Sequence, residues 1–452
     1  MVRVLIPTGA LGLAYDRQAL ARGVANRPDI IAVDGGSTDS GPSYPGRGVS
    51  KYSRATTRAE WRDLMLARAE AQVPLVIGTA GTCGTDGAVD WLFEITRELA
   101  GELGQRLRVA RLYSGQTADA VAEAMRSGRV AALPGAPAAD AATARDCCNI
   151  VALAGAEQIR AALDTGADIV IAGRTTDTAI IAALPIARNC HPGAAWHGAK
   201  VGECGALATT NPASGVIQID FDDTGFTIEP LGPRACATPY TVSAHMLYEN
   251  TDPFVLHEPG GHLDVTSARY RALDHRRVRV EGSVWVPGPY TVKLEGARVA
   301  GYQTVSLTLL RERRYVENAR AWAEDIAARG RAIAAARTGL GTDGFDIEMR
   351  LIGQDATLGA LETRQASPAE VGVLAIVTAP SEMLAGEIAK ILNPFLLHHA
   401  LTEDEPMPTF AFPFSPAEMN RGPVHEFCLH HVMALDDPMA AFRLQVTEVG
   451  LG

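Results

Sequence analysis

The sequence has 452 residues, of which 47% are hydrophobic and 6% aromatic, and its 41 Lys and Arg against 52 Asp and Glu give a formal net charge of −11. This length predicts two or three domains with a sizeable core, and the low aromatic share favours an α/β protein over a β-sandwich. Because the basic residues are dispersed, the composition argues against nucleic acid and anionic membranes as partners.

The first 190 residues alternate short apolar runs with helical patterns. The runs are continuous, and they cover residues 2–7, 29–34, 73–78, 107–113, 149–155 and 168–173. Such runs are typical of strands that are buried on both faces of a parallel sheet. Helical patterns between them, at 58–72 and 89–104, predict helices on both sides of that sheet. We therefore expect a Rossmann-like α/β domain over 1–190, which begins directly with a strand in place of a signal peptide.

Residues 191–452 have a different pattern. The segment 200–300 is rich in Gly, Pro and short strands, with a hairpin expected over 215–232. Beyond it, strands are expected over 301–310, 345–353, 371–379 and 408–414, with helices over 315–338 and 382–400. This is the βαββαβ order of a split-βαβ fold. We predict a second, α+β domain over 191–452 that includes the β-rich connecting segment.

Gly, Ser, Thr and Asp gather in five loops that follow predicted strands, at 7–12, 34–42, 78–86, 113–119 and 173–179. The ligand crevice of an open parallel sheet lies at this edge, where glycines admit a ligand and N–H and O–H donors suit an anion. We predict one crevice for a small carboxylate-bearing substrate, formed by residues 9–12, 34–42, 78–86 and 174–177. None of the loops has a GxGxxG or P-loop spacing, so no nucleotide cofactor is expected.

Several side chains in these loops are candidates for chemistry. Asp34, Asp39 and Asp86 could each act as a general base or together bind a divalent cation, and each could equally be a turn or cap residue. Arg174 could clamp a substrate carboxylate, so that Arg174→Ala abolishes binding with little loss of fold, or could form an ion pair with Asp177. The expected substrate contacts are Ser37, Thr38, Gly78, Thr79, Gly81, Arg174, Thr175 and Asp177.

The second domain is expected to complete the site. The first has no His before His191 and only Lys51 among its lysines, so a group with a pKa near 7 must come from elsewhere. Lys293 and Glu295 lie two apart on one strand face and could shuttle a proton, or could be a surface pair. In "MNRGPVHEF", Arg421 could bind the anion and His425 could transfer protons; alternatively, the segment closes its own sheet.

Two motifs contain cysteine or histidine residues for which the sequence does not favour a catalytic or metal-binding role. Cys204 in "GECGALAT" is expected to be a buried structural cysteine, because a catalytic thiol needs a cationic neighbour and His197 is near only in sequence. His257 and His262 have a spacing similar to that of metal ligands, but the intervening Pro-Gly-Gly prevents one helix from presenting both.

Four segments together resemble the acyclic terpene utilisation, AtuA-like family: "DIVIAGRTTDTA" (168–179), "GECGALAT" (202–209), "YTVKLEGARVAGYQT" (290–304) and "SPAEMNRGPVHEF" (415–427). The segment "DGGSTDSGP" (34–42) resembles the sequence of one sub-branch of this family. The resemblance covers most of the chain and implies a catabolic context. Members of the family are often encoded beside, or fused to, a short companion domain. The resemblance therefore implies a small companion subunit as a partner. A homo-oligomer is expected as well.

Three functions remain open from the sequence. The first is a cytoplasmic lyase of the hydro-lyase or hydratase type, acting on a small carboxylate or acyl-CoA substrate, since the rim suits an anion and acid/base candidates are present. The second is a hydrolase whose divalent cation is held by the Asp loops. The third is a non-catalytic subunit that binds a ligand and scaffolds a partner.

Overall fold

The computed structural model describes residues 1–364 and 368–450. The chain folds into two compact units: unit 1 comprises Met1–Arg298 and Phe427–Gly452, and unit 2 comprises Val299–Glu426. The expected boundary at residue 190 differs from this division. Residues 191–298 belong to unit 1, and four of their strands extend the same sheet as the first strands of the chain.

Unit 1 is built on a ten-stranded mixed sheet with the order β12-β13-β9-β8-β1-β2-β3-β7-β4-β19. Its centre consists of five parallel strands, as expected from the continuous apolar runs: β1 (Val2–Ile6), β2 (Ile30–Asp34), β3 (Leu75–Gly78), β7 (Ile169–Ala172) and β4 (Leu107–Tyr113). Antiparallel strands extend both edges: β8 (Ile217–Phe221), β9 (Gly225–Pro230), β13 (Val278–Glu281) and β12 (Arg269–Ala272) beyond β1, and β19 (Arg443–Val449) beyond β4.

Two expectations for this part of the chain are corrected. The run at 149–155 forms β6 (Asn149–Ala152), but β6 pairs antiparallel with β15 (Thr291–Leu310) and is not in the parallel sheet. The hairpin over 215–232 is confirmed as β8–β9, yet it extends the first sheet and does not connect to a second domain.

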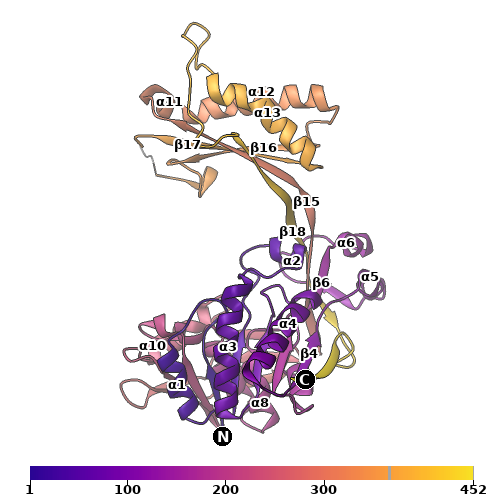
Figure 1. Ribbon diagram of the computed structural model, residues 1–452, viewed down its shortest axis with the longest axis vertical. Helices are drawn as coiled ribbons and strands as arrows, with labels where there is room; N and C mark the ends of the chain where they lie inside the picture. Colours follow the sequence, from indigo (N-terminus) through magenta and orange to yellow (C-terminus); the bar gives the residue numbers. More distant parts are fainter. Residues whose placement is uncertain (365–367, 451–452) are drawn as a thin grey trace. The chain divides into compact units, whose positions relative to one another are not determined.

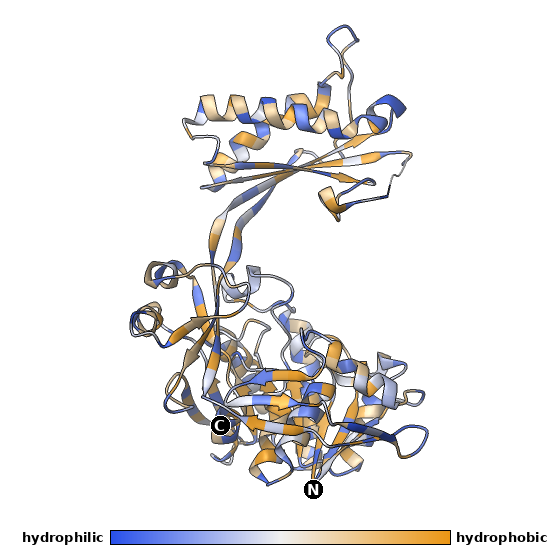
Figure 2. Ribbon diagram, turned by 180° about the vertical axis from the view of Figure 1, so that it is seen from behind, coloured by the Kyte–Doolittle hydropathy of each residue, from blue (hydrophilic) through white to orange (hydrophobic). Residues whose placement is uncertain are grey.

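Helices cover both faces of the sheet (Figure 1). Successive residues of β1 show this, because Leu5 joins one apolar cluster while Val4 and Ile6 join the other. On the Leu5 side lie α1 (Arg17–Ala25), α3 (Arg54–Ala71) and α4 (Asp86–Leu103); on the other side lie α7 (Ala156–Leu163), α8 (Ala179–Ala187) and α9 (Pro192–Gly202). Figure 2 shows the strands between these layers as predominantly apolar.

The remaining elements of unit 1 are short. They are α2 (Ser43–Arg47), α5 (Ala118–Arg126), β5 (Val130–Ala132), α6 (Ala141–Asp146), α10 (Pro239–Ala244), β10 (Val255–Glu258), β11 (Gly261–Asp264) and β14 (Val284–Pro287), with 3-10 turns at Gly205–Ala208, Pro212–Ser214 and His245–Leu247. The first residues of β15 and the last of β18 (Glu418–Ala434) also belong to unit 1.

Unit 2 follows the order β15, α11 (Arg313–Glu317), α12 (Ala319–Thr338), β16 (Asp346–Ile352), β17 (Val371–Ala379), α13 (Glu382–His398), β18, with a 3-10 turn at Gly359–Leu361. Its strands are arranged as β16-β17-β15-β18. Burial alternates along β17 because α12 and α13 cover one face of this sheet. The expectation of a strand at 408–414 is wrong. This segment has one isolated bridge, at Ala411, and the last strand of unit 2, β18, begins at Glu418.

Within the part of the chain that the structure describes, no helix combines the length and the apolar character needed to cross a membrane.

Candidate functional site

A cavity of about 730 Å³ lies at the carboxyl ends of the parallel strands of unit 1. Each of the four loops that were predicted to meet there contributes lining residues, so the loops do share one cavity, and the binding of a substrate in it stays a prediction. The lining residues are Gly9 and Ala10 from the first loop, Asp34, Gly36, Ser37 and Asp39 from the second, Thr82 from the third and Asp177 from the fourth. Lys51, Tyr52, Glu203, Cys204, Tyr248 and Glu249 are also part of the lining.

Glycine lets these loops approach one another closely. A Cβ on Gly84, which has φ +62°, would lie 2.3 Å from the backbone nitrogen of Arg174. A Cβ on Gly78 would lie 2.4 Å from Thr175 Oγ1. The loop after β3 therefore contacts the loop after β7 directly, which no larger residue at these two positions would permit.

Asp86 and the loop 113–119 lie elsewhere. Asp86 starts α4, accepts a hydrogen bond from Gly115 N (2.9 Å), and pairs with Arg443 at 3.2 Å. Both Asp86 and Gly115 line a second cavity, of about 530 Å³. Asp34, Asp39 and Asp86 are consequently not a single ligand set for a cation, because only Asp34 and Asp39 line the first cavity.

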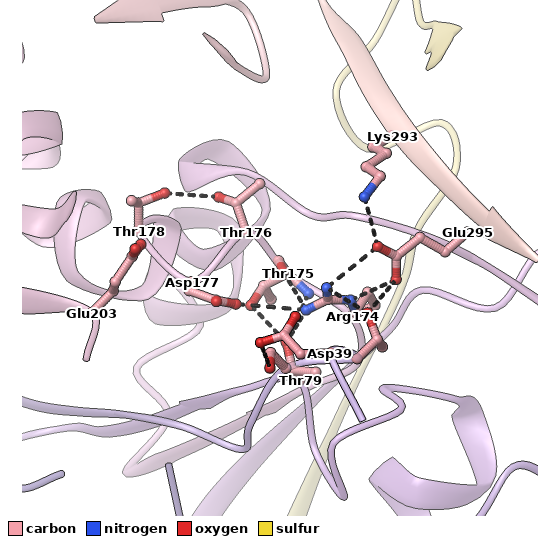
Figure 3. A network of polar contacts seen from close by, with 12 residues as sticks. Asp39, Thr79, Arg174, Thr175, Thr176, Asp177, Thr178, Glu203, Lys293 and Glu295 are labelled. Carbon is pink, nitrogen blue, oxygen red and sulfur yellow. Dashed lines mark hydrogen bonds and ion pairs between the residues drawn. The ribbon is translucent and has the colours of Figure 1, made fainter. Parts of the chain in front are cut away.

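Arg174 is the centre of a buried polar network (Figure 3). Its Nε and Nη2 donate to the two carboxylate oxygens of Glu295, at 2.9 and 3.4 Å. Its Nη1 donates to Thr79 Oγ1 at 3.2 Å and to the Thr175 carbonyl at 3.3 Å, and Nη2 also donates to Thr38 Oγ1 at 3.4 Å. These contacts occupy all five guanidinium donors with protein oxygens. The geometry thus favours an ion pair over the substrate clamp, but the main partner is Glu295 and not the expected Asp177, which lies 3.5 Å from Nη1.

Glu295 and Lys293 extend this network along β15. Lys293 Nζ lies 2.9 Å from Glu295 Oε1. Although burial raises the pKa of Glu295, Arg174 and Lys293 lower it more, to about 2. A carboxylate that stays ionised at neutral pH stabilises the two cations and is poorly suited to exchange protons with a substrate.

Asp34 and Asp177 differ from Glu295 in that their pKa values are raised. Asp34 is 4% exposed, lines the cavity, and its Oδ1 has no hydrogen-bond partner among the described residues. Burial, then the charge of Asp177, raises the pKa of Asp34 well above its usual value. Burial also raises the pKa of Asp177, whose Oδ1 lies 3.5 Å from Arg174 Nη1. Two interacting carboxyls with raised pKa values in one cavity are typical of acid/base sites.

The cavity is more acidic than the sequence predicts. Its lining includes the side chains of Asp34, Asp39, Asp177, Glu203 and Glu249, and among the described lining residues Lys51 is the one cation. A substrate carboxylate therefore meets several acidic groups, and its binding requires that some of these groups be protonated or that a cation be present.

A comparison with protein families matches residues 49–403 to the acyclic terpene utilisation family protein AtuA. The chain belongs to the AtuA family. No curated protein and no solved structure matches the chain.

The part of the chain that matches the AtuA family includes Lys51, Arg174, Glu295 and Glu203, whereas Asp34, Thr38 and Asp39 precede it. Of the other predicted contacts, Ser37 lines the cavity and donates to Asp39 Oδ2 at 2.5 Å, and Gly81 lies in the loop after β3 with φ +64°. Arg421 and His425 lie on the portion of β18 that belongs to unit 2, so their roles, and the completion of the site by them, stay predictions.

Sequence reasoning missed a second cluster of buried ionisable side chains beside the cavity. Lys200 and Glu203 form a buried ion pair at the end of α9, and burial raises the pKa of Glu203 to about 8. Cys204 and His245 lie next to it: burial raises the pKa of the Cys204 thiol and lowers that of His245 to about 4. The motif "GECGALAT" identified Glu203 and Cys204 as candidates, but no local pattern indicates His245, which lies 41 positions after Cys204.

His197 is not a partner of Cys204 in the described structure. It is fully buried, with Nδ1 2.7 Å from Ser283 Oγ and Nε2 3.2 Å from the Tyr270 hydroxyl. Burial lowers the pKa of His197 to about 3.

The His197 environment predicts a loss of stability in acid. At a pH between the folded pKa of His197 and its unfolded value of about 6.5, the imidazole binds a proton in the unfolded chain but not in the folded one. The contribution of His197 to the free energy of unfolding is therefore fully present above pH ~6.5 and decreases as the pH falls toward the folded pKa. From pH 7 to 5.5 we expect His197 to remove about 1.2 kcal/mol of the free energy of unfolding. Denaturant titrations at both pH values should show this difference in the parent and not in His197→Gln. The exposed His275→Gln variant is the control; an acid dependence unchanged in His197→Gln would contradict the assignment.

Proposed function

We propose that this AtuA family member is a catabolic lyase of the hydro-lyase or hydratase type that acts on a small carboxylate or its acyl thioester. The observation that carries the proposal is the pair Asp34 and Asp177, two carboxyls on the wall of one cavity whose pKa values burial raises, with the charge of Asp177 raising that of Asp34 further. The cavity volume, about 730 Å³, lies within the range of small-molecule sites.

The two carboxyls have different surroundings, which suits them to different roles. Arg174 lies beside Asp177 and stabilises its ionised form, so Asp177 is the base. Asp34 is enclosed, and its Oδ1 lacks a partner, so Asp34 retains its proton and is the acid. Glu295 and Lys293 position Arg174 and exchange no proton with the substrate.

The proposed reaction is a reversible dehydration. Asp177 removes the proton α to the carbonyl group, and the C–H electron pair becomes the new C–C double bond. The C–O bond at the β carbon breaks as Asp34 donates its proton, and the hydroxyl leaves as water. In the hydration direction, both transfers run in reverse, which restores the proton of Asp34.

Lys51 is the cation that we propose for binding the substrate's carboxylate. Its side chain is exposed and is part of the lining, so its ammonium group can reach an anion without breaking an internal ion pair. An acyl thioester carries no charge at this position and avoids the acidic wall. The preference between the two substrate classes therefore depends on Lys51.

The test is exchange of the α proton with solvent. The purified chain is incubated in D₂O with short 3-hydroxy and α,β-unsaturated carboxylates and their thioesters, and the products are followed by NMR. We expect one solvent deuteron at the α carbon and interconversion of the hydroxy and unsaturated forms. Cleavage of the thioester without exchange would show a hydrolase instead. Saturable binding without conversion would show a ligand-binding subunit.

A small companion subunit remains part of the proposal, on the grounds of the family resemblance. The same D₂O assay is therefore run with and without the companion. Activity that appears only in the mixture would assign this chain to an assembled enzyme, whereas equal activity in both would remove the companion from the proposal.

A further inference from the structure

Three side chains with metal-binding atoms converge at the wall of the cavity. Glu203 and Cys204 follow α9, and His245 begins the 3-10 turn His245–Leu247. One ligand atom from each of the three lies within 4.8 Å of the other two. Both Glu203 and Cys204 line the cavity, so an ion bound to this group would face the space where the substrate is proposed to bind.

A second observation concerns His245 itself. Its side chain is 5% exposed, and its Nε2 is a buried atom with no hydrogen-bond partner among the described residues. A buried nitrogen without a partner is costly, and such atoms are uncommon in folded proteins. Its ring stacks on Tyr248, at 5.3 Å between centroids, which fixes the orientation of the imidazole. An imidazole held in place with a nitrogen free is suited to accept a cation.

The neighbouring charges are compatible with a divalent ion. A carboxylate and a thiolate together neutralise two positive charges, and Lys200 binds one oxygen of Glu203 while the carboxylate keeps a second oxygen for the ion. Lys200 then orients the carboxylate of Glu203 through a hydrogen bond without touching the ion itself, as the hydrogen-bonded partners of metal ligands usually do. Asp177 and Cys204 also interact electrostatically with Lys200 and balance its charge.

We propose that Glu203, Cys204 and His245 form a binding site for one borderline divalent transition metal ion of the Zn²⁺ or Co²⁺ class. Thiolate, imidazole and carboxylate are the ligands that such ions prefer, and three protein ligands leave a fourth position open, as in catalytic sites. In a tetrahedral site the ligand atoms are about 3.3–3.8 Å apart, so binding requires small rotations of the three side chains. The sequence suggested a divalent cation with carboxylate ligands from Asp34, Asp39 and Asp86. The ion proposed here has other ligand residues and binds a thiolate and an imidazole in addition to a carboxylate.

The site is independent of the proposed reaction and is tested with the metal alone. The full chain is stripped with a chelator and titrated with Co²⁺, and absorbance and calorimetry are recorded. We expect one equivalent to bind, with the intense thiolate-to-cobalt charge-transfer absorption and the visible bands of a tetrahedral ion. Zn²⁺ should displace the cobalt and remove both signals.

Variants then identify the ligands. Cys204→Ser should lose the charge-transfer absorption. His245→Ala should weaken binding more than about 100-fold, since loss of a group that only hydrogen-bonds to a metal ligand costs about 10–100-fold. Cys148→Ser and His275→Gln, at exposed positions, are the controls and should bind as the parent does. Circular dichroism checks that each variant is folded. If the parent shows no charge-transfer absorption at one equivalent, or if the Cys204 and His245 variants bind normally, the proposal is overturned.

Discussion

The Arg174→Met variant is expected to lose about 3–5 kcal/mol of its free energy of unfolding, the usual cost of removing one partner from a buried ion pair. Arg174 is 7% exposed and supplies both hydrogen bonds that connect the loop after β7 to Glu295 on β15. Without it, the buried carboxylate of Glu295 retains Lys293 as its cationic partner among the described residues, and Thr79 Oγ1 loses one of its donors. The penalty comes mainly from the uncompensated charge.

Urea denaturation of three variants separates this explanation from simple loss of packing. The double variant Arg174→Met/Glu295→Met removes both charges and should recover a large part of the lost stability. Arg443→Met removes a cation from an exposed pair with Asp86 and should change stability by about 0–1 kcal/mol. The opposite result, a fully stable Arg174→Met protein that no longer binds a carboxylate ligand, would support the substrate clamp that the sequence suggests.

The Asp34→Asn variant is expected to lower turnover in the D₂O assay by about 10²–10⁴-fold, the range for removal of a general acid. Asn keeps the size and can accept the backbone hydrogen bonds from Gly35 and Gly36, but it has no proton to donate to the leaving hydroxyl. In the proposed mechanism Asp34 carries its proton in the folded protein, so the substitution changes no charge there. The melting temperature should therefore stay close to that of the parent.

This combination, a large loss of turnover with little change in stability, distinguishes catalysis from structure. Asp119→Asn makes the same chemical change at an exposed position on α5 and is the matched control. Turnover within tenfold of the parent in Asp34→Asn would contradict its role as acid. A large drop in melting temperature would instead show that Asp34 is ionised and supports the loops around it.

The sequence alone determined the local features of unit 1. Continuous apolar runs predicted β1, β2, β3, β4 and β7, because a strand covered on both faces needs apolar side chains at successive positions. The places where these strands end then predicted which loops share an edge, and four of them line one cavity. Both results follow from short-range patterns, since burial and chain direction are properties of a single segment.

Pairing between distant segments was decided only by the tertiary structure. The run of β6 is as apolar as that of β3, yet β6 pairs with β15, because nothing in a strand's own residues specifies its partner. The last strand shows the same limit: 408–414 is apolar and extended in pattern, but the ladder forms with Glu418–Ala434.

The chemistry of the site depends on the same long-range packing. The sequence left Arg174 open as a substrate clamp or a member of an ion pair, and the contact with Glu295, 121 residues later in the chain, favours the ion pair. Asp86 has the same loop composition around it as Asp34, but it begins α4 and lines another cavity. Asp34 and Glu295 are both carboxyls, and only their surroundings separate them: burial beside another acid raises the pKa of one, and two cations lower that of the other. Sequence specifies which groups are available, whereas desolvation and neighbouring charge, which set their protonation, exist only in the folded chain.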